Sequence, residues 1–229
     1  MEYRKVDEIQ SWPRRETFDH FYKQIPNVIT ITADVDVASM RDVCQRAGLR
    51  FFPSFLYLLC RIVNRHDEFK MGHNAEGEAV IWEQVSPSYT VFQEKDASFY
   101  SLNTAYHPDF SIFYQRVVSD MERSRSSNPS RSDQTAPNIF YVSCIPWLQY
   151  RSFGLQMYDD GKLLCPIFTW GKFEPSGKQM ILPFTVQIHH ACADGFHIAS
   201  FYHELQKELD GFSLETAGRT AETIDIRSS

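Results

Sequence analysis

Hydrophobic and polar residues alternate along two stretches of the chain, and this alternation predicts β-strands. Residues 28–37 are apolar at every second position, which is typical of a strand with one buried face. A second alternating stretch, 182–190, places His190 on the same face as the apolar positions 182, 184, 186 and 188, and Gln187 and His189 on the other face. His190 is therefore the histidine of the pair that we expect to point to the apolar side.

Other segments have apolar residues at helical spacing. Asp194 is expected to cap the helix at 195–209, since Asp is among the common N-caps. Pro13 fits the first turn of the helix at 13–23. Gly48 is expected to end the second helix. The segment 55–64 is apolar on nearly all sides, which predicts a buried helix. The predicted helices are 13–23, 38–47, 55–64, 109–125 and 195–209.

Between the helices lie further strand-like runs. Residues 79–85 and 88–93 flank Ser86 and Pro87, and we expect them to form a β-pair with its bend at the proline. Further strands are predicted at 138–147 and 163–172, and a turn at 175–177. The segment 124–137, rich in Ser, Arg, Asn and Pro, is expected to be an exposed loop.

Length and composition predict one globular domain over residues 1–210, followed by a polar, frayed tail at 211–229. Of the 229 residues, 43% are hydrophobic and 23% are charged, and the net charge of -6 argues against a general nucleic-acid binder. No apolar run is long enough for a signal peptide or a membrane span, so a cytoplasmic protein is expected. The five cysteines lack metal-ligand or redox spacing, and no metal is expected.

The tandem histidines are the strongest candidates for chemistry. An imidazole has an unperturbed pKa of about 6.5, close to working pH, and His190 stands where a strand ends, a position suited to a general base. The corner at Asp194 and Gly195 follows directly. Alternatively, His190 could be a histidine buried in the core with its hydrogen bonds satisfied, and Asp194 an ordinary helix cap.

The stretch His189-His190-Ala-Cys-Ala-Asp194-Gly195 resembles the His-His-x-x-x-Asp-Gly signature of chloramphenicol acetyltransferases, which are acetyl-coenzyme A-dependent O-acetyltransferases. The shorter His-x-x-x-Asp-Gly is shared with dihydrolipoamide acyltransferases. Two further segments resemble the same family, Trp12-Pro-Arg-Arg-Glu-Thr-Phe18 and Ser143-Cys-Ile-Pro-Trp147. The resemblance runs from about residue 3 to 209 and departs inside the motif, where Cys192-Ala193 replaces Val-Cys.

The resemblance implies an α+β fold, a two-layer sandwich with a mixed β-sheet and helices packed on one side. It also implies a homotrimer with active sites between subunits, chloramphenicol as acceptor and acetyl-CoA as co-substrate. His190 would be the general base, Ser143 the oxyanion donor, and Thr169 a water-mediated contact to the same transition state; Arg14 would pair with Asp194. The implied acceptor-pocket residues are Phe21, Tyr89, Thr90, Phe99, Tyr141, Phe153, Leu155 and Ile167.

Three alternatives remain at this point. The chain could be an acyltransferase of the same fold with another small acceptor. It could be the catalytic core of a dihydrolipoamide acyltransferase, although it shows no lipoyl domain or Ala/Pro-rich linker. It could also be a non-catalytic relative that sequesters a planar apolar ligand. An acyl-enzyme route through Cys144 or Cys192 is not favoured, because nothing in the sequence indicates an activated thiolate.

Overall fold

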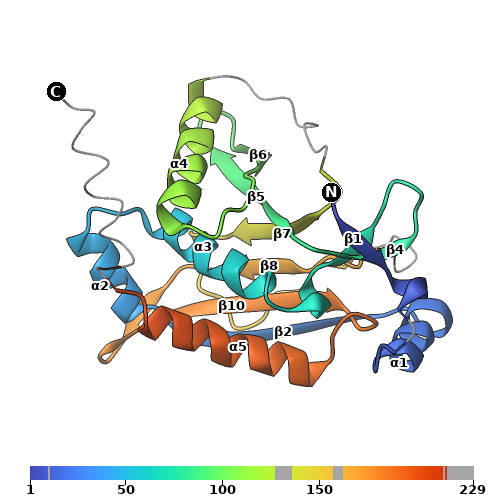
Figure 1. Ribbon diagram of the computed structural model, residues 1–229. Helices are drawn as coiled ribbons and strands as arrows, with labels where there is room; N and C mark the ends of the chain where they lie inside the picture. The colour runs from blue at the N-terminus through green and yellow to red at the C-terminus, as the bar shows by residue number, and fades with distance from the viewer. Residues whose placement is uncertain (10, 127–135, 157–161, 214, 216–229) are drawn as a thin grey trace.

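The computed structural model describes residues 1–9, 11–126, 136–156, 162–213 and 215 (Figure 1). Most of the predicted loop at 124–137 and of the predicted tail at 211–229 lies outside the described residues.

A mixed β-sheet forms the centre of the fold. Its strand order is β2-β10-β8-β7-β5-β6, and β9 pairs with β10 beside this path. Strands β5, β7 and β8 run parallel, while the other neighbours are antiparallel. The bounds are β2 Val28–Asp36, β5 Ser86–Gln93, β6 Ser98–Asn103, β7 Ile139–Cys144, β8 Ile167–Trp170, β9 Glu174–Ser176 and β10 Gln179–His189. The strands expected at 28–37, 138–147, 163–172 and 182–190 are therefore present, with shifted ends.

A smaller antiparallel sheet contains β1 (Tyr3–Lys5), β4 (Ala79–Trp82) and β3 (Met71–His73), in the order β1-β4-β3. The β-pair expected from residues 79–85 and 88–93 is wrong, because β4 and β5 belong to different sheets. Asn64 explains the break between them: its side-chain oxygen accepts from the Val85 N–H at 2.8 Å, and its amide donates to the Val85 carbonyl at 3.0 Å. Both backbone groups of Val85 are thus used before β5 begins.

Four helices lie on one face of the large sheet (Figure 1). They are α2 (Ala38–Arg46), α3 (Phe51–Val63), α4 (Phe110–Ser126) and α5 (Gly195–Asp210). Helix α3 begins earlier than expected because Pro53 is tolerated in a first turn, where no intrahelical N–H is needed. The core between helices and sheet is aromatic: Phe168, Phe184 and Phe201 are buried and stack on one another. This is the predicted two-layer α+β architecture.

The predicted N-terminal helix is divided in two. Helix α1 (Arg15–Asp19) continues as a single π-helical segment, η2 (His20–Gln24), at the edge of the fold near β1 (Figure 1). π-helical turns are rare and often lie at functional sites. Here the segment places Phe21 beside the tandem histidines.

Candidate active site

The tandem histidines stand at the end of β10, the longest strand of the sheet. The N–H of His190 still bonds to the Asn27 carbonyl, but the chain then turns sharply, and the carbonyl of His189 accepts from both Cys192 and Ala193. Asp194 ends the turn and caps α5 as predicted, since its carboxylate accepts from the backbone N–H groups of Phe196 and His197. The sequence thus folds into a strand, a tight turn and a capped helix within a few residues.

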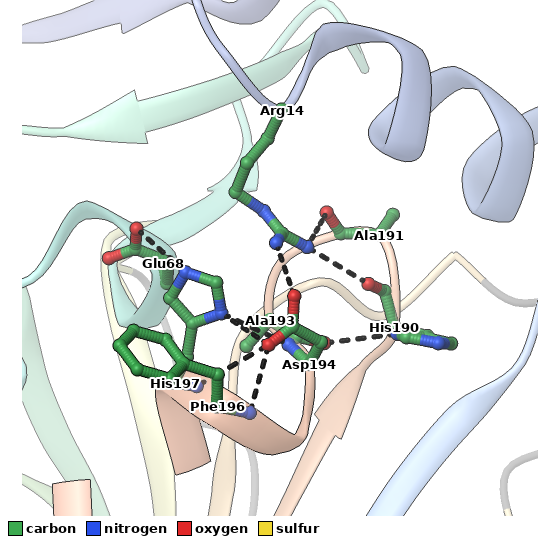
Figure 2. Close-up of polar contacts among 8 residues, drawn as sticks. All are labelled: Arg14, Glu68, His190, Ala191, Ala193, Asp194, Phe196 and His197. Atoms are coloured by element: carbon green, nitrogen blue, oxygen red, sulfur yellow. Dashed lines mark hydrogen bonds and ion pairs between the residues drawn. The ribbon is translucent and has the colours of Figure 1, made fainter. Parts of the chain in front are cut away.

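Arg14 holds this turn from outside. Its Nη1 donates to Asp194 Oδ2 at 2.8 Å, and its Nη2 lies 3.5 and 3.4 Å from the carbonyl oxygens of His190 and Ala191 (Figure 2). The Arg14 side chain is only 13% exposed. Burial raises the pKa of the Asp194 carboxyl, but hydrogen bonds from Arg14 and His197 more than offset it, and the pKa falls to about 2. The ion pair implied by the resemblance is therefore present, and Asp194 is ionised at neutral pH.

The ring of His190 has a defined orientation. It stacks on Phe21 with ring centroids 3.8 Å apart, and its Nδ1 lies 3.2 Å from the carbonyl oxygen of Ala193. Because a carbonyl can only accept, this contact requires the proton on Nδ1. In the neutral ring Nε2 then carries the lone pair, as a general base needs.

The more deeply buried histidine of the pair is His189, which is 1% exposed, whereas His190 is half-buried. This corrects the expectation that His190 points to the apolar core. The alternation holds only while the strand lasts, and β10 ends at His189. Beyond it the ring of His190 lies against Phe21 and not among the core residues.

The other implied site residues lie mostly on the face of the sheet opposite the helices. Ser143 of β7 is level with Thr169 of β8, which is level with Thr185 of β10. Residues that are paired across neighbouring strands share a face, so these three hydroxyls form a row across the sheet. Tyr141 and Ile167 form the next row on the same face, level with each other.

A pocket of about 510 Å³ opens at the Ser143 end of this region. Of the implied residues it includes Ser143, Thr90 and Phe99. Phe92 and Trp147, exposed at 44% and 63%, pack edge to face in it with centroids 4.6 Å apart. The other lining residues are Phe52, Val91, Ala97, Met121, Cys144, Ile145 and Pro146. The sequence signal for such a wall is its 14% share of aromatic residues, since neither Phe92 nor Phe52 belongs to a recognisable motif.

Phe153 and Leu155 lie on a chain segment that crosses the helix-free face. The N–H of Phe153 is 3.4 Å from the hydroxyl of Thr32, and the amide of Gln187 exchanges two hydrogen bonds with the backbone of Leu155. They do not line the pocket at Ser143. Thr169 is 2% exposed. The hydroxyl of Tyr150 donates to the backbone carbonyl of Thr169.

Tyr89 does not fit the expected pocket role. It is fully buried, its ring packs against Phe52, and its hydroxyl bonds to Thr104 at 2.9 Å. The reason is the alternation along β5, which sends Tyr89 to the helix side of the sheet and Thr90 to the other side. Tyr89 is a core residue.

His190 and Ser143 are far apart within one chain. They are separated by two strand spacings, through Thr169 and Thr185, and by five residues along β10. With strands about 4.8 Å apart and a rise of about 3.3 Å per residue, their backbones are separated by about 19 Å. The two halves of the implied site therefore lie at different places on one subunit.

The described ranges hold no group of three or more His, Cys, Asp and Glu residues arranged to bind a metal ion. Within the same ranges, no helix has both the length and the apolar character needed to cross a membrane.

The mixed sheet with helices on one face matches the fold of coenzyme A-dependent acyltransferases, which chloramphenicol acetyltransferases share with dihydrolipoamide acetyltransferases. It is similar to the dihydrolipoamide acetyltransferase of Azotobacter vinelandii, with a TM-score of 0.62 and 16% identity over 86% of each chain. It is also similar to a solved chloramphenicol acetyltransferase, with a TM-score of 0.78 and 22% identity, covering 91% of this chain and 100% of that one.

The sequence gives the narrower assignment. The family model "Chloramphenicol acetyltransferase" matches residues 1–206. A chloramphenicol acetyltransferase of Clostridium perfringens is 38% identical over 92% of this chain and 100% of its own. One from Streptomyces acrimycini is 36% identical over 88% and 92%, respectively. The chain belongs to the chloramphenicol acetyltransferase family.

Proposed function

We propose that the chain transfers acetyl from acetyl-coenzyme A to a hydroxyl of chloramphenicol and so confers resistance to this antibiotic. The observation that carries the proposal is the orientation of His190, whose Nδ1 donates to Ala193 and whose Nε2 remains available as a base, in a chain matched by the family model over residues 1–206. We place the enzyme in the cytoplasm, a compartment in which buried thiols such as Cys60 and Cys192 remain reduced.

In this mechanism His190 acts on the acceptor. Its Nε2 takes the proton of the chloramphenicol hydroxyl while that oxygen attacks the thioester carbonyl of acetyl-coenzyme A. The resulting tetrahedral intermediate collapses, the carbon–sulfur bond breaks, and the proton passes from His190 to the leaving thiolate. A positioned base of this kind contributes about 10²- to 10⁴-fold to the rate.

The oxyanion of the intermediate needs hydrogen-bond donors other than His190, which acts on the acceptor hydroxyl. Ser143 lines the pocket with its hydroxyl on the helix-free face, and we assign it as the direct donor. Removing such a donor typically costs about a hundredfold or more in kcat. Thr169 stands level with Ser143 on the neighbouring strand, a position suited to holding a water molecule at the same oxyanion. Thr90, Phe99 and Tyr141 share this region and would contact the acceptor.

The site is completed by a second subunit in a homotrimer. A base and an oxyanion donor must both lie within about 3 Å of the reacting atoms, whereas His190 and Ser143 of one chain are about 19 Å apart. A ring in which each subunit turns its His190 edge toward the Ser143 pocket of its neighbour satisfies this requirement at every interface. The separation within one chain supports the shared site, and the family resemblance supports the number three.

An acyl-enzyme route through cysteine is disfavoured. Burial raises the pKa of the Cys144 thiol to about 12, and it raises the pKa of the fully buried Cys192 thiol further. Neither sulfur would be a thiolate at neutral pH, although the thiolate is the nucleophilic form. Direct transfer between two bound substrates is therefore the proposed path.

One assay tests the proposal against its alternatives. Purified protein is mixed with acetyl-coenzyme A and chloramphenicol, or with dihydrolipoamide as a second acceptor, and free coenzyme A is measured by chromatography, because dihydrolipoamide would itself react with a thiol reagent. Release that depends on chloramphenicol supports the proposal. Release only with dihydrolipoamide, or binding of chloramphenicol without release, would refute it in favour of an acyltransferase core or a ligand-sequestering relative.

A further inference from the structure

The carboxylate of Asp194 is hydrogen-bonded to a second side chain besides Arg14, that of His197. His197, in the first turn of α5, places its Nδ1 2.8 Å from Asp194 Oδ1, while Arg14 binds Oδ2. Each carboxylate oxygen thus has its own side-chain partner, and the two partners approach from different sides (Figure 2). The function proposed above assigns no role to His197.

The charge of Asp194 determines where the proton of His197 lies. Since the pKa of Asp194 is lowered to about 2, the carboxylate can only accept, and the 2.8 Å contact requires a proton on Nδ1 of His197. The other ring nitrogen, Nε2, faces Glu68 Oε1 at 3.6 Å and forms an ion pair with it when the ring is doubly protonated. The side chains of His197 and Glu68 are only 21% and 25% exposed. The imidazole is therefore held between two carboxylates.

Glu68 comes from a distant part of the chain. It lies in the short 3₁₀-helix η3 (Asp67–Phe69), just before the smaller sheet. Its neighbour Asp67 points elsewhere, to Arg4 and Lys70. Glu68 is thus the residue of η3 that faces the catalytic turn.

One rigid unit connects His197 to the catalytic histidine. The peptide group between Ala193 and Asp194 has its carbonyl oxygen 3.2 Å from Nδ1 of His190. Its nitrogen belongs to Asp194, whose side chain accepts from the protonated Nδ1 of His197. Because that Nδ1 carries a proton, it does not accept from the Asp194 N–H, which lies 3.4 Å away. A trans peptide group is planar, and its C=O and N–H point in opposite directions. If Asp194 loses the hydrogen bond from His197 and shifts, the peptide group rotates and turns its carbonyl away from His190. The ring of His190 would then lose the hydrogen bond that keeps the proton on Nδ1 and leaves Nε2 as the base.

We propose that His197 is a positioning residue for His190, acting through the Asp194 side chain and the Ala193–Asp194 peptide, with Glu68 holding the far side of its ring. The inference rests on the proposed role of His190 as the base. An ordinary helix cap would stabilise α5 but leave the turnover of each folded molecule unchanged, and this difference separates the two explanations.

The first test uses three variants and a matched control. His197→Ala should lower kcat by about 10- to 100-fold, the cost of a displaced catalytic group, with both KM values changed less than about twofold. His197→Asn should recover most of the loss, because its amide nitrogen can occupy the place of Nδ1 and donate to Asp194. Glu68→Gln should lower kcat by less than His197→Ala does. Asp67→Asn, which alters the same turn of η3 without touching His197, should leave kcat unchanged.

The second test measures directly which ring nitrogen of His190 carries the proton. The chain contains eight histidines, so ¹⁵N-histidine-labelled protein without substrates gives few ring signals, and the His190 pair is assigned by its loss in His190→Ala. The parent should show one protonated and one unprotonated ring nitrogen for His190. In His197→Ala the two shifts should move toward an average, because both tautomers are then populated. This readout needs no acetylation, so a parent protein that does not acetylate chloramphenicol would refute the proposed function while leaving the inference testable.

An unchanged kcat in His197→Ala would overturn the inference, and so would a lowered kcat with an unchanged His190 spectrum. If His197→Ala does not fold, His197→Gln replaces it, since that side chain reaches toward Glu68 but has no donor at the Nδ1 position. The same two readouts then decide.

Discussion

Two inactive variants of this chain should regain activity when they share one assembly. His190→Ala removes the proposed base and Ser143→Ala removes the proposed oxyanion donor. Each variant alone should retain at most about 1% of the parental kcat. Neither change disturbs the main core, since both side chains are only half-buried and lie outside the aromatic layer between sheet and helices.

The size of the recovery follows from the geometry. Because the two residues of one chain are about 19 Å apart, an active site takes His190 from one subunit and Ser143 from the next. In an equal, random mixture, half of the subunits carry an intact His190 and the other half an intact Ser143. About one quarter of the interfaces in the whole mixture then hold both. Trimers that contain both variants have one such interface of three, so after purification on both tags they should show about a third of the parental activity. A three-to-one mixture should give about 19% before this purification and again about a third after it.

The assay requires mixed assemblies. The two variants carry different affinity tags, are unfolded and refolded together, and are purified on both tags in succession. Free coenzyme A is followed with chloramphenicol and acetyl-coenzyme A at saturation. Each variant refolded alone sets the background, and the parent treated in the same way sets the full value. No recovery in assemblies that carry both tags, or a monomer in sedimentation, would refute the shared site.

Three further predictions concern the catalytic turn. First, His190→Ala should lower kcat by more than about a hundredfold without lowering the melting temperature. His189→Ala, at a buried position, should mainly lower the melting temperature. Thermal unfolding and kinetics of both variants check these two outcomes. Second, Arg14→Met and Asp194→Asn should each lower the free energy of unfolding by about 2 kcal/mol, a value between those for exposed and buried ion pairs. Urea unfolding of the double variant measures the coupling, and purely additive losses would show that the two residues are not coupled. Third, the stabilising effect of the Asp194 charge should be complete at neutral pH and lost as the pH falls from about 4 toward 2, since the folded-state pKa is lowered. The stability difference between the parent and Asp194→Asn should therefore shrink over this window, and a difference that stays constant in acid would contradict the lowered pKa.

Local elements of this protein are readable from the sequence because their signals are local. The alternation at 28–37 and 182–190 predicts β2 and β10, and Gly48, whose φ is +64°, stops α2 as expected. The cap at Asp194 was predictable from one residue and the spacing that follows it. The same alternation could have shown that Tyr89 and Thr90 face opposite sides of β5, and only one of them was available to a pocket.

Other features depend on partners that are remote in the sequence. The separation of β4 from β5 relies on Asn64 at the end of α3, and the burial of His189 and not His190 depends on where β10 ends and where Phe21 packs. Glu68 and His197 are 129 positions apart, and nothing near Glu68 in the sequence indicates a contact with the catalytic turn. Such contacts arise only when the small sheet and α5 are packed together.

By itself, the sequence determined the chemical groups and their immediate setting: a histidine at the end of a strand, a capping aspartate, and a serine near a strand end before a proline. Periodicity and capping act over a few residues, and these features follow from them. The tertiary structure decided the distances. The strand order β10-β8-β7 places two strand spacings between His190 and Ser143, and their positions along the strands add five residues of β10. Strand order is set by packing across the whole sheet, and no local pattern encodes it.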